Sequence, residues 1–292
     1  MKFADVGQQL RAYRLESGMR AEEIAARLGV SRAALYRYEK GEVIKLETIR
    51  RLAELLKISP LSLLGIGVEY FSRPAAFAER LRNLEEQADQ ILQVGGRLCQ
   101  PLTTDAFDGA MVEAWSESVI NAPDRAVALA AIEQAMQTLN FRKRNYSARR
   151  PNMTVVLCES TVRRFLTEGV AGSLPIPEPT RARCRIAAIA EASNIATLME
   201  SLPIGLQIGL AQGVEPSGTF RIMRGRERAH VATSPFPIDC LPWVSTGVTS
   251  ITSADDAIGM HQRVAESVWR DALKGGAAAE RVRQLIREAE TR

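Results

Sequence analysis

A glycine between two short amphipathic segments constrains the fold of this chain more than any other feature. Before it, Ile24 and Leu28 stand four positions apart, so they share one face of a helix. Gly29 follows directly and can adopt the left-handed conformation that ends a helix. Ser31 can then cap a second helix, because its hydroxyl can accept from the free backbone N–H groups of the next turn. Residues 20–41 therefore predict two short helices joined by a tight turn.

The segments on either side complete a small all-helical unit. Val6, Leu10 and Tyr13 recur at spacings of four and three, which predicts a first helix with one core face. Four further helices are expected over residues 21–28, 32–40, 46–56 and 61–64. The turn between the second and third helices has the length found in the helix-turn-helix, whose second helix lies in the major groove of DNA.

The residues LGVSRAALYRYEKG, with the later LETIRRLAELLKIS, resemble the Cro/C1-type (XRE, phage-repressor-like) helix-turn-helix regulators over about Val6–Leu64. The resemblance implies an ion pair between Arg14 and Glu39 that ties the first helix to the recognition helix. The chain departs from the family at Ala21, where a glutamine is usual, and in the short loop 42–45, which lacks the usual proline. These departures concern contacts with phosphate, and the five-helix fold is still expected.

Docking of the third helix in the major groove assigns roles to individual residues. The candidate base readers are Arg32, Ala33, Ala34, Tyr36 and Arg37. Arginine can bond bidentately to guanine, and alanine can pack on a thymine methyl group. The candidate phosphate contacts are Arg20, Ser31, Lys40 and Lys45. Such contacts position a protein on the duplex without reading its sequence.

The net charge of the chain is concentrated at this end. The whole chain carries 38 basic and 34 acidic side chains, a net charge of +4. Residues 1–64 hold 12 of the basic and 8 of the acidic side chains, so the remainder of the chain is neutral. An excess of positive charge in the domain expected to face phosphates agrees with DNA binding.

The chain beyond this unit predicts an α+β fold in two further parts. Apolar residues at steps of three and four predict a long helix over residues 75–94, within a connecting segment of residues 67–96. Two interpretations of this helix remain open: it packs on its own C-terminal domain, or it forms a dimer interface. Residues 97–292 are expected to form a mixed α/β regulatory domain, following an N-terminal domain of residues 1–66.

Within the C-terminal region, helices are expected over residues 104–119 and 122–139. The β-branched run MTVVLC predicts a buried strand, IGLQIGLAQG a second, and GTFRIMRGRERAHVATSPF a hairpin. Helices over 163–166, 183–201, 252–274 and 277–289 complete the pattern. The order of VLCESTVRRFL, IGLQIGL and SGTFRIMRG resembles the regulatory domain of actinobacterial helix-turn-helix regulators.

Two basic clusters of this region each have two interpretations. Residues 140–150 interleave the aromatic residues Phe141 and Tyr146 with five cations, which suits nucleic acid but also a solvated loop. The cations are Arg142, Lys143, Arg144, Arg149 and Arg150. The second cluster consists of Arg221, Arg224, Arg226 and Arg228. It could form a cationic stripe for an anionic ligand or flanking DNA, or protect an edge strand against aggregation.

Catalytic and metal-binding patterns are missing from the sequence. His230 and His261 are the two histidines and show no ligand spacing. The cysteines are Cys99, Cys158, Cys184 and Cys240, and their scatter indicates reduced thiols. A self-cleaving Ser–Lys protease could cut the Ala171-Gly172 bond, but Lys274 is the only lysine after Lys143 and no serine lies in the usual setting before it. No enzyme activity, metal or cofactor is expected.

These observations predict a sequence-specific transcriptional regulator that binds double-stranded DNA as a homodimer and acts as a repressor. The C-terminal domain is expected to control it through a small-molecule effector or a small protein partner. The chain begins with a charged helix and has no apolar run near the ~20 residues that span a bilayer, so a cytoplasmic protein is expected. The alternative is an antitoxin-like or other interaction module, whose C-terminal half binds a protein and whose helix-turn-helix autoregulates.

Overall fold

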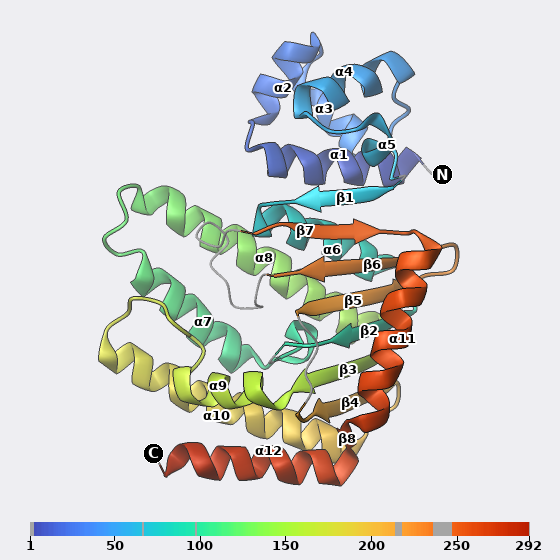
Figure 1. Cartoon of the computed structure of the whole chain (residues 1–292). Helices are drawn as coiled ribbons and strands as arrows, with labels where there is room; N and C mark the ends of the chain where they lie inside the picture. Colours follow the sequence, from blue (N-terminus) through green and yellow to red (C-terminus); the bar gives the residue numbers. More distant parts are fainter. Residues whose placement is uncertain (1–2, 66, 97, 214–217, 236–246, 292) are drawn as a thin grey trace.

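Five helices form the N-terminal unit of the computed structural model, which describes residues 3–65, 67–96, 98–213, 218–235 and 247–291. They are α1 (Phe3–Ser17), α2 (Ala21–Leu28), α3 (Arg32–Glu39), α4 (Leu46–Leu56) and α5 (Pro60–Leu63). The prediction of a five-helix unit is confirmed, with boundaries for α2 to α5 that agree within about one residue. This unit stands above a larger body built on a sheet (Figure 1).

The turn between α2 and α3 has the predicted local geometry. Gly29 adopts the left-handed conformation with φ 71°, and its N–H donates to the carbonyl oxygen of Ala26 at 3.1 Å. The hydroxyl of Ser31 accepts from the backbone N–H of Ala34 at 3.1 Å, which caps α3. Ile24 and Leu35 are fully buried, so each helix anchors the turn through its apolar face.

The body contains an eight-stranded sheet in the order β1-β7-β6-β5-β2-β3-β4-β8. Its strands are β1 (Val68–Phe71), β2 (Gln90–Val94), β3 (Asn152–Cys158), β4 (Leu206–Ala211), β5 (Thr219–Arg224), β6 (Ala229–Ser234), β7 (Thr249–Thr252) and β8 (Leu273–Lys274). Strands β2, β3 and β4 pair in parallel, and the other pairs are antiparallel. The predicted mixed α/β body and the predicted hairpin are confirmed.

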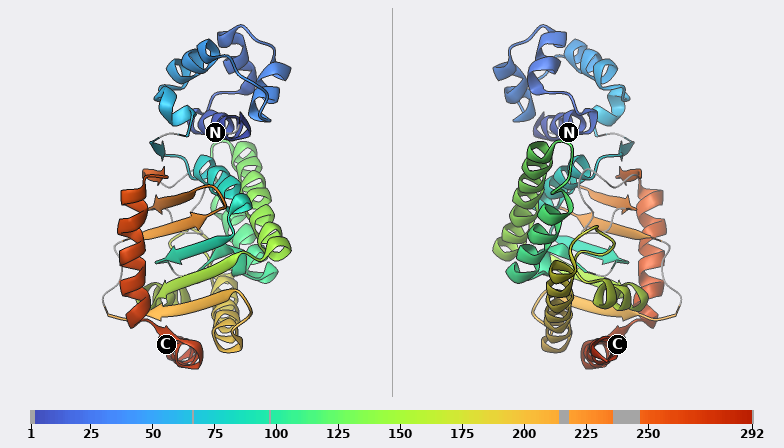
Figure 2. Two further views of the ribbon diagram at one scale, coloured as in Figure 1. Left: turned by 90° about the vertical axis from the view of Figure 1, so that its right-hand side faces the viewer. Right: turned by 90° about the vertical axis from the view of Figure 1, so that its left-hand side faces the viewer.

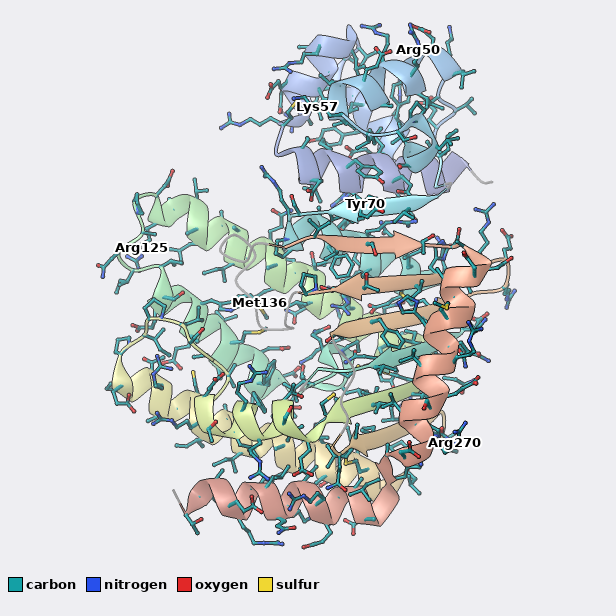
Figure 3. The ribbon with its side chains drawn as sticks, viewed as in Figure 1. Arg50, Lys57, Tyr70, Arg125, Met136 and Arg270 are labelled. Atoms are coloured by element: carbon teal, nitrogen blue, oxygen red, sulfur yellow. The ribbon has the colours of Figure 1, made fainter. Side chains whose placement is uncertain are left out.

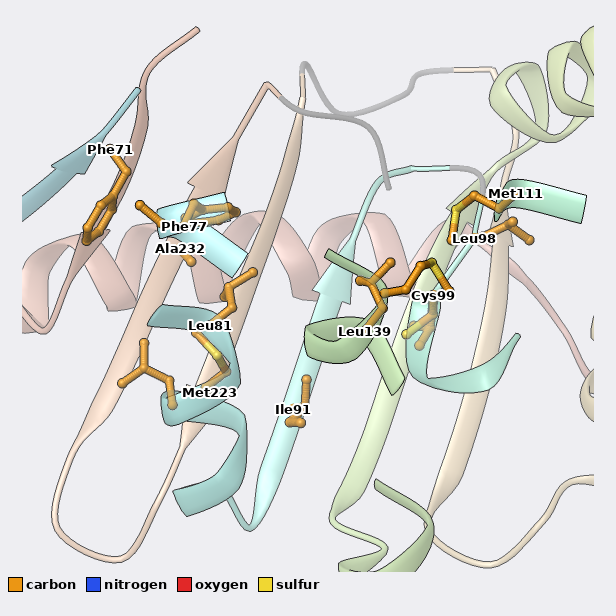
Figure 4. Close-up of a cluster of buried hydrophobic side chains, with 14 of the residues drawn as sticks. Phe71, Phe77, Leu81, Ile91, Leu98, Cys99, Met111, Leu139, Met223 and Ala232 are labelled. Atoms are coloured by element: carbon orange, nitrogen blue, oxygen red, sulfur yellow. The ribbon is translucent and has the colours of Figure 1, made fainter. Parts of the chain in front are cut away.

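Helices cover the two faces of the sheet unequally (Figures 1 and 2). One face is covered by α6 (Pro74–Gln87), α7 (Asp105–Ser118), α8 (Arg125–Arg149) and α10 (Glu178–Ser201), with a 3-10 turn at Gln100–Leu102. Helices α9 (Glu159–Glu168) and α12 (Gly275–Glu290) pack beside the end of the sheet that holds β3, β4 and β8. Of the described helices, α11 (Asp255–Asp271) alone lies on the other face. Each face has its own apolar cluster, and Figure 4 shows Phe77 and Leu81 of α6 beside Met223 and Ala232 of the sheet.

The prediction of one long helix over residues 75–94 is wrong for its C-terminal part. Helix α6 stops at Gln87, and Gln90–Val94 forms β2 between β3 and β5. Pairing with strands from distant parts of the chain therefore outweighs the helical spacing of the apolar residues. Helix α6 lies against α1 of the N-terminal unit and against α8 and β1 of the body.

The basic segment 140–150 is not a solvated loop, because its residues 140–149 continue α8. Arg142 is buried and donates from Nη2 to Oε1 of Glu85 at 2.8 Å. Lys143 is also buried, and its Nζ donates to the carbonyl oxygen of Thr104 at 2.9 Å and to Asp108. These two cations hold α8 against α6 and α7, so they are not available to nucleic acid. The other cations of the segment, Arg144, Arg149 and Arg150, are exposed.

The arginine cluster of the hairpin also differs from both interpretations. Strand β5 lies inside the sheet between β6 and β2, so it is not an edge strand. Arg221 and Arg224 are three positions apart on this strand and point to opposite faces. Arg226 and Arg228 lie beyond its end and are exposed. No continuous cationic stripe forms among these residues.

Candidate nucleic-acid interface

Helix α3 presents two arginines to solvent. The side chains of Arg32 and Arg37 are 59% and 64% exposed. Ala33 is also exposed, and Tyr36 is half-buried against the core of the domain. Four of the five candidate base readers therefore lie on an accessible surface of one helix.

Ala34 is the exception, because it is buried and only 9% of its surface is exposed to solvent. Its backbone N–H also donates to the Ser31 hydroxyl in the helix cap. The expectation that Ala34 lies on the exposed face with the other candidates is wrong. Its small side chain packs inside the domain, on the same side of α3 as Leu35.

Both exposed arginines contact acidic side chains of their own domain. Arg32 lies 2.8 Å from a carboxylate oxygen of Glu22 on α2, and it donates to the hydroxyl of Tyr36 at 3.3 Å. The hydrogen bond to Tyr36 and the charge of Glu22 raise the pKa of Arg32 above its usual value. Arg37 lies 2.9 Å from Glu42, just after the helix. These pairs are exposed, so exchange of Glu22 and Glu42 for DNA groups costs little.

The candidate phosphate contacts surround the same helix. Ser31 is exposed at the N-cap of α3, Lys40 follows its last residue, and Arg20 and Lys45 precede α2 and α4. Within the described ranges, Arg20, Lys40 and Lys45 have no carboxylate oxygen within 4 Å. Figure 3 shows Arg50 and Lys57 elsewhere on this domain, and Arg50 is paired with Glu47 and Glu54.

Helix α1 fixes the position of α3 through a buried ion pair. Nη2 of Arg14 donates to Oε2 of Glu39 at 3.1 Å, and Nε donates to the other oxygen at 2.5 Å. Glu39 is buried and Arg14 half-buried, which confirms the pair that the family resemblance implied. Burial opposes the charge of Arg14, but the hydrogen bonds and charge of Glu39 outweigh it and raise the pKa of Arg14.

Gly7 is a further positioning residue, which the sequence analysis missed. A Cβ at this position would lie 2.5 Å from the carbonyl oxygen of Tyr38 and 2.8 Å from the backbone nitrogen of Gly41. Only glycine lets α1 approach the C-terminal end of α3 this closely. The signal could have been found, because Gly7 interrupts an otherwise regular helix one position after Val6.

The domain is joined to the sheet by polar contacts on α1. Nε2 of Gln9 donates to Glu69 of β1, whose carboxylate also accepts two hydrogen bonds from Arg80 of α6, at 2.8 and 2.9 Å. The carboxylate of Glu16 accepts from the backbone N–H groups of Ser72 and Arg73 at 2.7 and 2.9 Å. The orientation of α3 relative to the sheet is thus set by buried as well as exposed contacts.

The described residues show no cluster of metal-binding side chains. No group of three or more His, Cys, Asp and Glu side chains in these ranges could hold a metal ion. Cys99 and Cys184 are free and buried, Cys158 is buried, and Cys240 lies outside the described residues. Burial raises the pKa of the Cys99 thiol to about 11, so it is not a thiolate nucleophile at neutral pH. No described helix has both the length and the apolar character to cross a membrane.

The capped turn, the exposed face of α3 and the pair that fixes it define the N-terminal residues as a helix-turn-helix DNA-binding domain. The family described as "Helix-turn-helix domain" matches residues 5–63 of this chain. None of the curated proteins matches the chain.

Among solved structures, the chain is similar to TrmBL2, described as an archaeal chromatin protein with a novel mode of DNA binding. The identity is 12%, the TM-score is 0.33, and the match covers 78% of this chain and 62% of that one. The chain therefore spans less than two thirds of that protein.

Proposed function

We propose that this protein is a sequence-specific transcriptional regulator of the Cro/C1 type that acts in the cytoplasm as a homodimeric repressor. The exposed face of α3, with Arg32 and Arg37 on a capped helix locked to α1, is the observation that supports this function best. The protein acts by binding, without catalysis. The C-terminal body controls it through a ligand or a partner.

Helix α3 enters the major groove in this proposal. Arg32 and Arg37 read base edges, because a guanidinium can donate to both acceptors of guanine. Ala33 packs against a thymine methyl group, and Tyr36 supports Arg32 through the hydroxyl contact at 3.3 Å. Arg20, Ser31, Lys40 and Lys45 contact phosphates and position the helix without reading sequence.

A homodimer places two copies of α3 on one face of the duplex. Helix-turn-helix dimers read two half-sites about 34 Å apart, one turn of B-DNA, so the operator repeats the two-fold symmetry of the protein. Repression follows if this site overlaps the one where transcription starts. Doubling the phosphate contacts compensates for the modest charge of one domain.

Selection of bound DNA from random duplexes, with the purified full chain, tests this function. We expect enrichment of a two-fold symmetric sequence that contains guanines, with half-sites about ten base pairs apart. The matched experiment uses a variant with Arg32 and Arg37 both changed to Ala, which should enrich no sequence. Equal enrichment by both proteins would contradict the docking, and failure of the native chain to enrich any sequence would contradict the proposed function.

A further inference from the structure

A cavity of about 690 Å³ lies between the sheet and α11, on the face opposite the other helices. Its walls are the first residues of β2, β3 and β4, the end of β5, the loop of residues 202–205 and one side of α11. One described helix covers this face, so part of the sheet surface beside it stays open. The cavity therefore lies outside the DNA-binding domain.

The strand register gives the floor of the cavity its chemistry. Gln90 is paired with Arg224 of β5 and with Asn152 of β3, so these three side chains share a row. The next row contains Ile222, Leu92 and Thr154, followed by Gln207 of β4. Ile222 and Leu92 belong to the apolar cluster around α11, so both rows face the cavity. The floor combines amides, a hydroxyl and one cation with an apolar strip.

Arg224 is the cation of this floor, and the carboxylate of Glu266, which also lines the cavity, does not contact it directly. Its Nη2 donates to the amide oxygen of Gln262 at 3.3 Å. Gln262 donates in turn to Glu266 at 2.9 Å, so this carboxylate contacts the amide instead of Arg224. In the part of the chain that the structure describes, no carboxylate oxygen lies within 4 Å of Arg224.

Arg221, on the same strand, differs from Arg224 because it has a carboxylate partner. It projects to the opposite face, where it contacts Glu85 and Gln93. The buried guanidinium groups of Arg80 and Arg142 likewise each have a carboxylate partner. Arg224 is half-buried and lacks the carboxylate partner that these arginines have, so a carboxylate or phosphate group could pair with it.

Trp269 of α11 supplies an aromatic wall. Its ring packs so closely on β4 that a Cβ at Gly209 would lie 2.9 Å from it. At the rim, the side chains of Leu202 and Ile204 are exposed to solvent. A cavity with apolar walls and a few convergent polar groups is typical of sites for small organic molecules.

We propose that this cavity binds a small organic anion, with its carboxylate or phosphate on Arg224 and its apolar body against Trp269. The amides of Gln90 and Gln262 are placed to hydrogen-bond its remaining polar atoms. Binding itself does not depend on the DNA-binding function, and only the use of the site for regulation rests on the proposed function.

The test measures binding without DNA, on the full chain labelled with 15N in its tryptophans. The indole signal of Trp269 is assigned with Trp269→Phe and followed during titration with phenylacetate, phenyl phosphate and the neutral isostere phenylacetamide. We expect a saturable shift of this signal with at least one of the two anions, and binding about tenfold or more weaker for the amide. The preferred anion distinguishes a carboxylate site from a phosphate site.

Two variants complete the experiment. Arg224→Gln should weaken binding of the preferred anion about tenfold or more, whereas Arg226→Gln, in the exposed turn of the same hairpin, should bind as the native chain does. Thermal unfolding of both variants shows whether the body stays folded. The proposal is overturned if neither anion shifts the Trp269 signal, if the amide binds equally well, or if folded Arg224→Gln binds with unchanged affinity.

Discussion

Gln9 and Glu69 meet between the DNA-binding domain and the sheet. Nε2 of Gln9, on α1, donates to Oε1 of Glu69, on β1, at 2.8 Å, and both side chains are buried. Close by, the rings of Tyr13 and Phe71 stack with their centroids 5.3 Å apart. The helix-turn-helix domain is therefore packed onto the body through a polar and an aromatic contact, and the orientation of α3 is coupled to the edge of the sheet.

Replacement of Glu69 by Ala should weaken this junction strongly. The change removes the carboxylate that Gln9 and Arg80 both contact, and loss of one partner of a buried ion pair costs ~3–5 kcal/mol. Urea unfolding followed by circular dichroism measures the loss. Val68→Thr, at an exposed position of the same strand, serves as the control and should be nearly neutral. Equal stability of Glu69→Ala and the native chain would contradict the coupling.

Neighbouring alanines of α3 should respond differently to the same substitution. Ala34→Glu forces a charge into the core of the domain and should destabilise it by several kcal/mol. Ala33→Glu leaves the fold intact, because Ala33 is exposed, but it should abolish DNA binding through repulsion by the phosphates. Thermal unfolding and DNA affinity separate the two effects. A stable, DNA-binding Ala33→Glu variant would show that this face of α3 does not approach DNA.

Glu22→Gln should increase the affinity for DNA. It releases Arg32 from a carboxylate 2.8 Å away and removes a negative charge beside the recognition helix. Because the exposed pair is weak and the removed charge is negative, we expect affinity to rise by a factor of about two to five at low salt. Fluorescence anisotropy with the selected site measures it, and Glu54→Gln on α4 should have a smaller effect. A decrease in affinity for Glu22→Gln would mean that Glu22 orders Arg32 for binding.

The N-terminal domain could be predicted because its signals are local. Gly29 and Ser31 act within one turn of their own helices, and the apolar spacing of α4 already defines its buried face. The sequence predicts an exposed Ala34, and this prediction is wrong because its burial depends on how α3 is rotated against α1 and α2. Helical spacing alone does not determine that rotation. The close approach at Gly7 likewise requires the packing of two helices.

The C-terminal body was less predictable because its determinants are distant in sequence. Residues 90–94 continue the apolar spacing of α6, and only their pairing with β3 and β5 makes them a strand. The burial of Arg142 could not be predicted from its neighbours in the sequence, because its partner Glu85 lies 57 positions earlier. The cavity near Arg224 depends on the register of four strands and on the path of α11.

Acid should destabilise the body through Glu85. Burial alone would raise the pKa of Glu85, but the charges of Arg142 and Arg221 outweigh burial and hold the pKa below its usual value of 4.5. The unfolded chain then binds a proton more readily than the folded one. This part of the stability is therefore present above about pH 4.5 and is lost as pH falls toward the lowered pKa.

The measurement is the difference in free energy of unfolding between the native chain and Glu85→Gln, from pH 7 to pH 3. It should be largest at pH 7 and shrink as the pH falls below about 4.5, because Glu85 of the native chain is then protonated first in the unfolded state. Glu86→Gln, at the exposed neighbouring position, should show little difference at any pH. A difference for Glu85→Gln that is constant with pH would contradict the assigned pKa direction.

The central claim is that α3 reads bases while the surrounding cations contact phosphates. Two single variants test it most directly, through their base preference and the salt dependence of their affinity for DNA. Affinity for the selected operator and for single-base variants of it is measured at several salt concentrations for Arg32→Ala, Lys45→Ala and Arg50→Ala, the last as an off-site control. We predict that Arg32→Ala costs ~1–3 kcal/mol and relaxes preference at one base pair of each half-site. Lys45→Ala should weaken all sequences equally and lower the salt slope by about one for each protomer. An Arg32→Ala variant with unchanged affinity and unchanged base preference would contradict the account.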